Sequence, residues 1–185
     1  MATIKSKKFF WAVFGVVLLS IALAFTFWEF SPNRARKIKC VGDDLMISSL
    51  VLPDLKGEKV DVAKFRGKVI LLNFWATWCS PCKKEIPDLN ELFKQYREAG
   101  LVVIGIALDQ GGPEEVRKFL EKYQIEYINL MGNEAVLEAF QNIPGLGSIQ
   151  GIPTSFLIDR KGQICRRFVG YTEKAIFEEA IKQLL

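Results

Sequence analysis

The apolar and polar positions of this 185-residue chain predict one long apolar segment followed by alternating strands and helices. Phe9–Trp28 contains no charged residue and only two polar side chains, Ser20 and Thr26. Twenty helical residues measure about 30 Å, the thickness of the hydrocarbon core of a membrane. The segment therefore predicts a membrane-spanning helix. A buried core helix is the less favoured interpretation, because core helices seldom run this long without a charge.

The apolar segment also raises the questions of cleavage and orientation. Ala22-Leu23-Ala24 resembles a signal-peptidase site, but the apolar run continues to Phe30, which favours an uncleaved anchor. Basic residues stand on both sides of the segment, so charge alone does not give its orientation. We expect a short basic segment over 1–8, a transmembrane anchor over 9–30, a basic linker over 31–45 and a folded domain over 46–185.

After residue 45 the pattern is typical of an α/β protein. Val69–Trp75 is a continuous apolar run and predicts a strand buried on both faces, and Pro81–Ala99 predicts a helix that ends at Gly100. Thr172 is expected to cap a last helix, with Ile176 among its inward residues. The other expected elements are a hairpin of Ile47–Leu52 with Lys59–Val60, a helical turn over Asp61–Phe65, strands over Leu101–Leu108, Tyr127–Leu130, Ser155–Asp159 and Gln163–Val169, and helices over Pro113–Tyr123, Glu134–Phe140 and Glu173–Leu184. This order predicts a central mixed β-sheet flanked by helices on both faces.

Charge and composition exclude several classes of function. The first 40 residues hold seven of the 25 Lys and Arg residues and one of the 21 Asp and Glu residues. The remaining 18 basic and 20 acidic residues give a net charge of −2, so no nucleic-acid partner is expected. His is absent, which excludes catalytic His pairs and His-ligated zinc or haem. Four Cys residues are too few for a disulfide-rich scaffold.

The candidate reactive residues are the two cysteines of Trp78-Cys79-Ser80-Pro81-Cys82, a motif that lies between the expected strand and helix. Cysteines three residues apart can close a small disulfide ring. Backbone N–H groups at the helix start would stabilise a thiolate at Cys79, while Cys82 would stay protonated until it resolves a mixed disulfide. A four-cysteine zinc site with Cys40 and Cys165 is disfavoured, because 125 residues separate these two. An inert structural disulfide is disfavoured by the Trp and Pro of the motif.

The run NFWATWCSPC followed by KKEIP resembles the thioredoxin superfamily, and within it the membrane-anchored TlpA/ResA-type thiol-disulfide oxidoreductases. The similarity covers roughly residues 46–185. Ile152-Pro153-Thr154 stands where the superfamily has its cis-proline loop, and the strand and helix between Leu101 and Ile143 resemble the insert of this subfamily. The resemblance implies a thioredoxin-like fold with Cys79 as nucleophile and Cys82 as resolving thiol of a redox-active disulfide. It implies substrate binding by Trp78, Ile152, Pro153 and Thr154.

The resemblance also implies a role for Glu85, which matches the acidic residue beneath the active site of the family. Glu85 lies one helical turn after Cys82 and could move the proton of that thiol. An ordinary exposed glutamate is the alternative. Asn73 stands where plain thioredoxins have a buried Asp, and because Asn cannot titrate, proton transfer would fall to Glu85. We expect Cys165 to be an incidental thiol, and the sequence leaves its pairing with Cys40 open.

The implied function is dithiol–disulfide exchange with protein substrates, as a reductant on the periplasmic side of the cytoplasmic membrane. Apocytochrome c is the implied client, and a membrane electron donor of the CcdA/DsbD type would recharge the protein. No cofactor is expected, because the exchange needs none. One alternative is a thiol peroxidase of the same fold, whose Thr precedes a single Cys by three residues, whereas Thr77 precedes Cys79 by two. The other is a tethered binding or chaperone module.

Overall fold

The computed structural model describes residues 38, 40–41, 50–141, 143 and 145–185. The chain divides into two compact units, Met1–Lys37 and Ile38–Leu185. The predicted membrane segment, Phe9–Trp28, and the start of the first expected strand lie outside the described residues. In the described part of the chain, none of the helices combines the length and the apolar character that crossing a membrane requires.

A five-stranded mixed sheet forms the centre of the unit Ile38–Leu185, with the strand order β5-β4-β3-β6-β7. Its strands are β3 (Val69–Trp75), β4 (Leu101–Ala107), β5 (Ile128–Met131), β6 (Thr154–Ile158) and β7 (Ile164–Val169). β3, β4 and β5 run parallel, whereas β6 is antiparallel to β3 and β7 is antiparallel to β6. β1 (Val51–Pro53) and β2 (Lys59–Asp61) form a separate antiparallel hairpin, as the sequence predicts.

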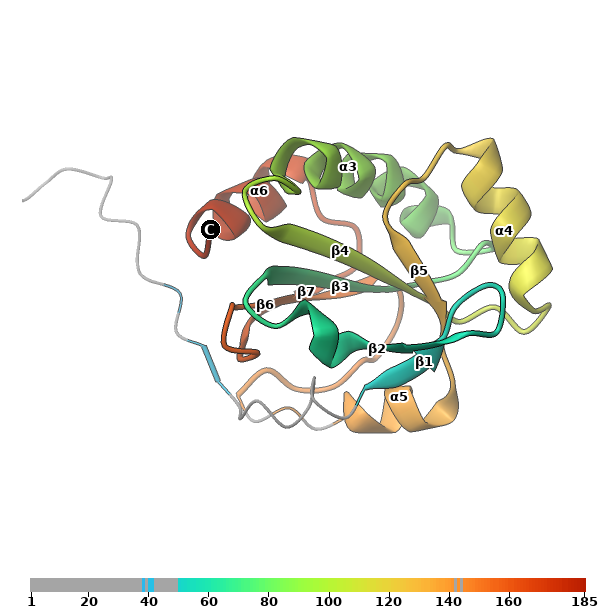
Figure 1. The fold of residues 1–185 in the computed structure, drawn as a ribbon, viewed down its shortest axis with the longest axis horizontal. Coiled ribbons are helices and arrows are strands. Elements are labelled where there is room, and N and C mark those ends of the chain that lie inside the picture. Colours follow the sequence, from blue (N-terminus) through green and yellow to red (C-terminus); the bar gives the residue numbers. More distant parts are fainter. Residues whose placement is uncertain (1–37, 39, 42–49, 142, 144) are drawn as a thin grey trace, which may run out of the picture. The chain divides into compact units, whose positions relative to one another are not determined.

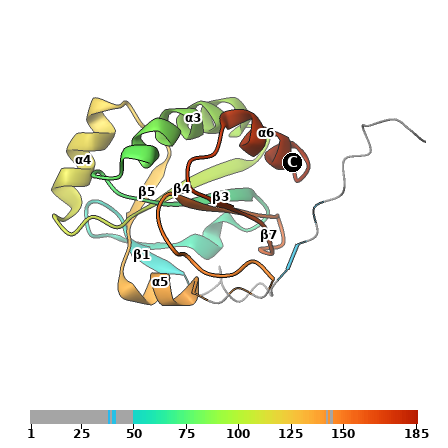
Figure 2. The same cartoon turned by 180° about the vertical axis from the view of Figure 1, so that it is seen from behind.

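Helices cover both faces of the sheet (Figures 1 and 2). They are α3 (Ser80–Tyr96), α4 (Pro113–Lys122), α5 (Glu134–Ala139) and α6 (Lys174–Lys182), with a 3-10 turn η1 over Val62–Phe65. α3 and α6 lie on one face, and α5 lies with the β1–β2 hairpin on the other. Successive side chains of a strand point to opposite faces of the sheet. Leu71 therefore packs in the hydrophobic cluster that includes Ile86 of α3, and Leu72 packs in the cluster that includes Val136 of α5. Every residue of β3 is therefore buried, as its continuous apolar run predicts.

Within the described residues, the predicted strands and helices are confirmed to within a few residues, with three differences in the helices. α3 ends at Tyr96, and Gly100 instead closes the turn after it, with φ +106°. The prediction that Thr172 caps the last helix is wrong: α6 has no side-chain cap, and the Thr172 N–H donates to Glu85 instead. Ile176 is 40% exposed rather than inward.

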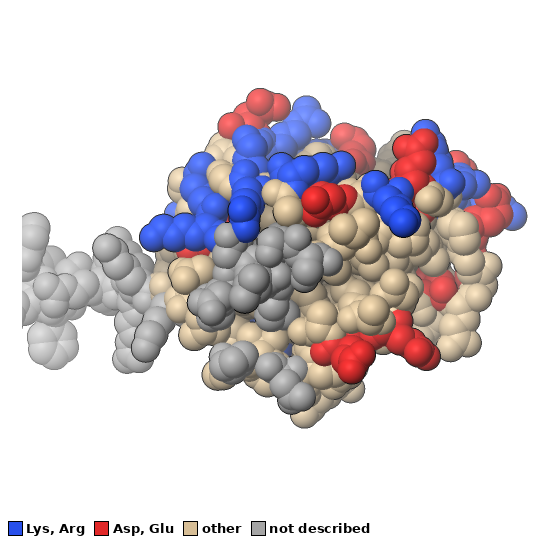
Figure 3. Space-filling view, turned by 60° about the horizontal axis from the view of Figure 1, so that its bottom comes forward, with Lys and Arg blue, Asp and Glu red and all other residues tan. Residues whose placement is uncertain are grey.

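The two ends of the sheet carry different groups. The loops that leave the carboxyl ends of β3 and β4 hold Cys79 and Asp109. At the opposite end lies the β6–β7 turn, where Arg160 accepts a hydrogen bond from Gly67 N (3.1 Å) and donates one to Leu185 O (2.8 Å). Arg160 and Lys161 are exposed there. Figure 3, in which the bottom of the Figure 1 view is turned forward, shows Lys and Arg side chains gathered at the upper left of the molecule.

Candidate active site

Cys79 is the N-cap of α3 and forms a disulfide with Cys82, one turn inside the helix. The backbone N–H of Cys82 points at Cys79 Sγ, 3.2 Å away. Pro81, in the first turn, lacks the N–H that would be unpartnered there. Cys79 is 4% exposed and Cys82 is fully buried. A thiolate at Cys79 would receive this N–H and the positive end of the helix dipole, so Cys79 is the better placed nucleophile of the pair.

The loop before β6 faces the disulfide. The Ile152–Pro153 peptide bond is cis, as the resemblance implies, and Ile152 O lies 3.7 Å from Cys79 Sγ. Thr154 is buried, and its hydroxyl donates to Gly151 O at 2.6 Å. The Thr154 side chain thus holds the loop, whereas the backbone of Ile152 stands beside the sulfur.

Exposed apolar side chains stand on the chain segments next to this loop. Trp78, which precedes Cys79, is 65% exposed. Val169, 57% exposed, pairs with Thr154 across β6 and β7. Gly170 N donates to Pro153 O at 2.8 Å, and the next residue, Tyr171, is 47% exposed. The sequence analysis identified Trp78 but not Val169 or Tyr171. These two residues lie near the cis-proline only because β7 pairs with β6.

Glu85 is buried beneath this end of the sheet, with 1% exposure, so the alternative of an ordinary exposed glutamate is wrong. Its Oε1 accepts a hydrogen bond from Asn73 Nδ2 (3.0 Å) and its Oε2 accepts one from Thr172 N (2.9 Å). Burial raises the pKa of Glu85 to about 7, although the two hydrogen bonds favour the ionised form. The carboxyl can therefore gain or lose a proton near neutral pH.

A row of polar residues crosses the α3 face of the sheet. Ser155, Asn73, Gly105 and Asn129 occupy neighbouring positions on β6, β3, β4 and β5. Asn73 Nδ2 also donates to Ser155 Oγ at 2.9 Å. A Cβ on Gly105 would lie 2.2 Å from Asn129 Oδ1, so glycine leaves the space in which Asn129 accepts a hydrogen bond from Trp75 Nε1 (3.1 Å). This row places a non-titrating amide, not a second acid, beside Glu85.

Asp109 fixes the chain just before the reactive motif, a role that the sequence reasoning missed. Its two carboxylate oxygens accept from Thr77 N at 3.0 and 3.1 Å, and Oδ1 lies 2.5 Å from Thr77 Oγ1. Glu115 Oε1 also lies within hydrogen-bond distance of that hydroxyl, at 2.8 Å. The order of the strands could have indicated this role. Asp109 follows β4, and the carboxyl end of β4 lies beside that of β3 in the parallel sheet.

Cys40 and Cys165 form a second disulfide, so the prediction that Cys165 is an incidental thiol is wrong. The two disulfides lie on different elements, one at the start of α3 and the other on β7. Among the described residues, the group of possible metal ligands that contains Cys40 and Cys165 is completed by Asp159 and does not include Cys79 or Cys82, which excludes the four-cysteine zinc alternative.

The chain resembles known proteins over most of its length. Residues 43–167 match the AhpC/TSA family. A protein of Bacillus cereus named "Thiol-disulfide oxidoreductase ResA" is 30% identical over 181 residues, which cover 97% of this chain and 98% of that one. A protein of the same name from Geobacillus kaustophilus is 35% identical, with 91% of each chain covered. The crystal structure of a thiol:disulfide interchange protein from Chlorobium tepidum superposes with a TM-score of 0.68 at 31% identity, covering 79% of this chain and 97% of that one.

Sequence, fold and geometry agree on a paired-cysteine exchange site on a thioredoxin-like sheet. The two ResA relatives, which cover 97% and 91% of this chain, carry a name that states this same activity, thiol-disulfide oxidoreductase. The chain thus belongs to the AhpC/TSA family of thioredoxin-fold proteins, and within it to the ResA-type thiol-disulfide oxidoreductases.

Proposed function

We propose that the protein reduces disulfides of protein substrates, with Cys79 as the attacking thiolate and Cys82 as the resolving thiol. One observation carries this assignment. Cys79 Sγ receives the Cys82 N–H at the helix start and also lies 3.7 Å from Ile152 O, where an extended client backbone can pair. The exposed side chains of Trp78 and Tyr171 offer apolar contacts to such a client.

In the reductive direction the Cys79 thiolate attacks one sulfur of the client disulfide and displaces the other as a thiolate, which takes up a proton. Cys82 then loses its proton and attacks Cys79 Sγ, which breaks the mixed disulfide and releases the second client thiolate. Two electrons pass to the client, and the Cys79–Cys82 disulfide forms. Glu85 is the residue we assign to receive the Cys82 proton, because it is buried and its pKa is about 7.

We further propose that the apolar segment Phe9–Trp28 anchors the protein in the cytoplasmic membrane with the thioredoxin-like unit on the periplasmic side. The length and lack of charge of this segment support the anchor. The similarity to ResA proteins, which covers 97% of this chain, supports apocytochrome c as client and a CcdA/DsbD-type donor as the source of electrons.

Trapping of the mixed disulfide tests the assignment of the two thiols. Cys82→Ser should accumulate a covalent adduct with an apocytochrome c peptide that carries a disulfide, whereas Cys79→Ser should form none. The potential of the Cys79–Cys82 pair tests the direction. A value near about −270 mV, as in thioredoxin, supports a reductant, and one near about −120 mV would make the protein a disulfide donor. Rapid consumption of hydrogen peroxide by the reduced protein would instead favour the peroxidase alternative.

A further inference from the structure

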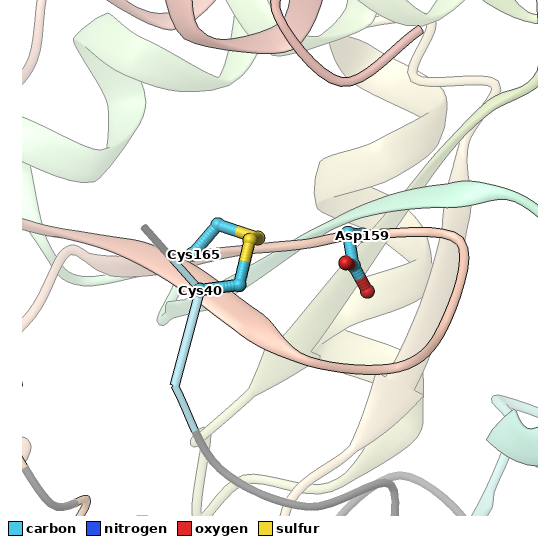
Figure 4. A group of neighbouring side chains, drawn as sticks. All are labelled: Cys40, Asp159 and Cys165. Carbon is cyan, nitrogen blue, oxygen red and sulfur yellow. A yellow bond between two sulfur atoms is a disulfide. The ribbon is translucent and has the colours of Figure 1, made fainter. Parts of the chain in front are cut away.

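The Cys40–Cys165 disulfide joins the segment before the β1–β2 hairpin to the edge of the central sheet (Figure 4). Val41 N donates to Ile164 O at 2.8 Å and Ile164 N donates to Val41 O at 3.0 Å, so these residues form an antiparallel bridge. Cys40 and Cys165 are the next pair, with Cα atoms 3.7 Å apart. Since β7 is an edge strand, the segment adds one hydrogen-bonded and one covalent attachment to its open side.

This attachment lies toward the end of the sheet opposite the reactive disulfide. β7 starts at Ile164, after the β6–β7 turn, and ends at Val169, which pairs with Thr154 beside the cis-proline. Cys165 lies four residues before Val169, which is about 13 Å along an extended strand. The two disulfides are therefore too far apart for direct exchange between them.

The chemical surroundings of the second disulfide oppose thiolate attack. A carboxylate oxygen of Asp159 and the two sulfur atoms all lie within 4.8 Å of one another (Figure 4). Asp159 Oδ1 accepts from Lys161 N and Gln163 N, both at 2.9 Å, so the β6–β7 turn holds the carboxylate in place. Attack by a thiolate brings negative charge to the sulfurs, and a carboxylate at this distance repels it.

The two cations that follow Cys165 in β7 each have a partner other than the disulfide. The Arg166 guanidinium lies 4.9 Å from the centre of the Phe168 ring, and Arg167 donates to Ser148 O. Burial does not distinguish the two disulfides, since Cys165 is 5% and Cys79 is 4% exposed. The electrostatic surroundings do distinguish them, because an N–H group and a helix start face the sulfur of Cys79.

We propose that Cys40–Cys165 is a non-exchanging disulfide that clamps the segment around Cys40 and Val41 to the edge strand β7, with Asp159 protecting the bond from thiolate attack. The clamp and its protection rest on contacts within the unit Ile38–Leu185.

Reduction of the full-length oxidised chain with dithiothreitol tests the protection. Opening either disulfide takes two electrons and two protons from the reagent, and the new thiols are alkylated at set times and counted by peptide mass spectrometry. Cys79–Cys82 should open at least about 100-fold faster than Cys40–Cys165. Asp159→Asn keeps an oxygen for the Lys161 and Gln163 N–H groups but removes the charge. It should speed the opening of Cys40–Cys165 about tenfold and leave Cys79–Cys82 unchanged.

Equal opening rates in the unaltered chain would overturn the clamp as a non-exchanging bond. An unchanged rate in Asp159→Asn would overturn the protective role of Asp159. Tight binding of zinc by the reduced chain, lost in Asp159→Asn, would instead make Cys40, Asp159 and Cys165 a metal site and overturn the clamp.

Discussion

Replacing Glu85 by Gln should change how the stability of the folded unit depends on pH. Burial raises the pKa of Glu85 from 4.5 to about 7, while the unfolded chain titrates near 4.5. The folded state thus holds this proton more tightly, and the resulting stabilisation is fully present below about pH 4.5. It is lost as the pH rises through about 7. The two pKa values differ by about 2.5, which corresponds to about 3 kcal/mol.

The Gln side chain separates this effect from the hydrogen bonds of the site. Its oxygen can accept from Asn73 Nδ2, but its amide nitrogen cannot accept from the Thr172 N–H, and the lost bond costs about 1–3 kcal/mol at every pH. The readout is therefore the pH dependence and not the absolute stability. In urea unfolding of oxidised Ile38–Leu185, the wild type should lose about 3 kcal/mol more than Glu85→Gln between pH 4.5 and 8.5.

An exposed glutamate provides the matched control. Glu121 lies on the exposed side of α4, so Glu121→Gln should reproduce the pH dependence of the wild type. If the curves of wild type and Glu85→Gln ran parallel from pH 4.5 to 8.5, the folded and unfolded states would titrate Glu85 alike. The reasoning from burial, and with it the assignment of Glu85 as proton acceptor, would then be refuted.

Three further outcomes are expected. Glu85→Gln should slow resolution of a mixed disulfide more than Asn73→Ala does, since only Glu85 can take the proton; stopped-flow thiol exchange with equal or reversed slowing would contradict this. Replacing both Cys40 and Cys165 by Ser should lower the unfolding free energy by up to about 5 kcal/mol, because the bond closes a loop across 125 residues, and an unchanged urea midpoint would oppose it. Tyr127→Phe should raise the melting temperature by about 2–4 °C, because the buried Tyr127 hydroxyl has no hydrogen-bond partner among the described residues. A fall in the melting temperature would show that the hydroxyl is satisfied.

Local sequence determined most of the secondary structure and the reactive motif. The run Val69–Trp75 is apolar at every position, so only a strand covered on both faces suits it, and the structure has this strand with the same bounds. Cys79 and Cys82 stand three residues apart at a helix start, and Pro81 fits the first turn. These features depend on neighbours within one turn or one strand, and the printed sequence contains them in full.

The tertiary structure decided the features that join residues distant in the chain. The sequence predicts Thr172 to be a helix cap, but its N–H donates a hydrogen bond to Glu85, 87 residues earlier in the chain. The same contact helps to bury the Glu85 carboxyl. Cys165 forms a disulfide with Cys40, 125 residues away in sequence, because Val41 pairs with Ile164 of β7 and places the two cysteines next to each other.

The sequence by itself therefore determined the α/β class, the approximate positions of the strands and helices and the paired-cysteine motif at a helix start, because each follows from local periodicity and spacing. Only the packing of the sheet decided that Glu85 is buried with a pKa near neutrality and that the second pair of cysteines is closed. Burial and disulfide pairing depend on which segments meet in space, and a periodicity of two or 3.6 residues carries no information about that.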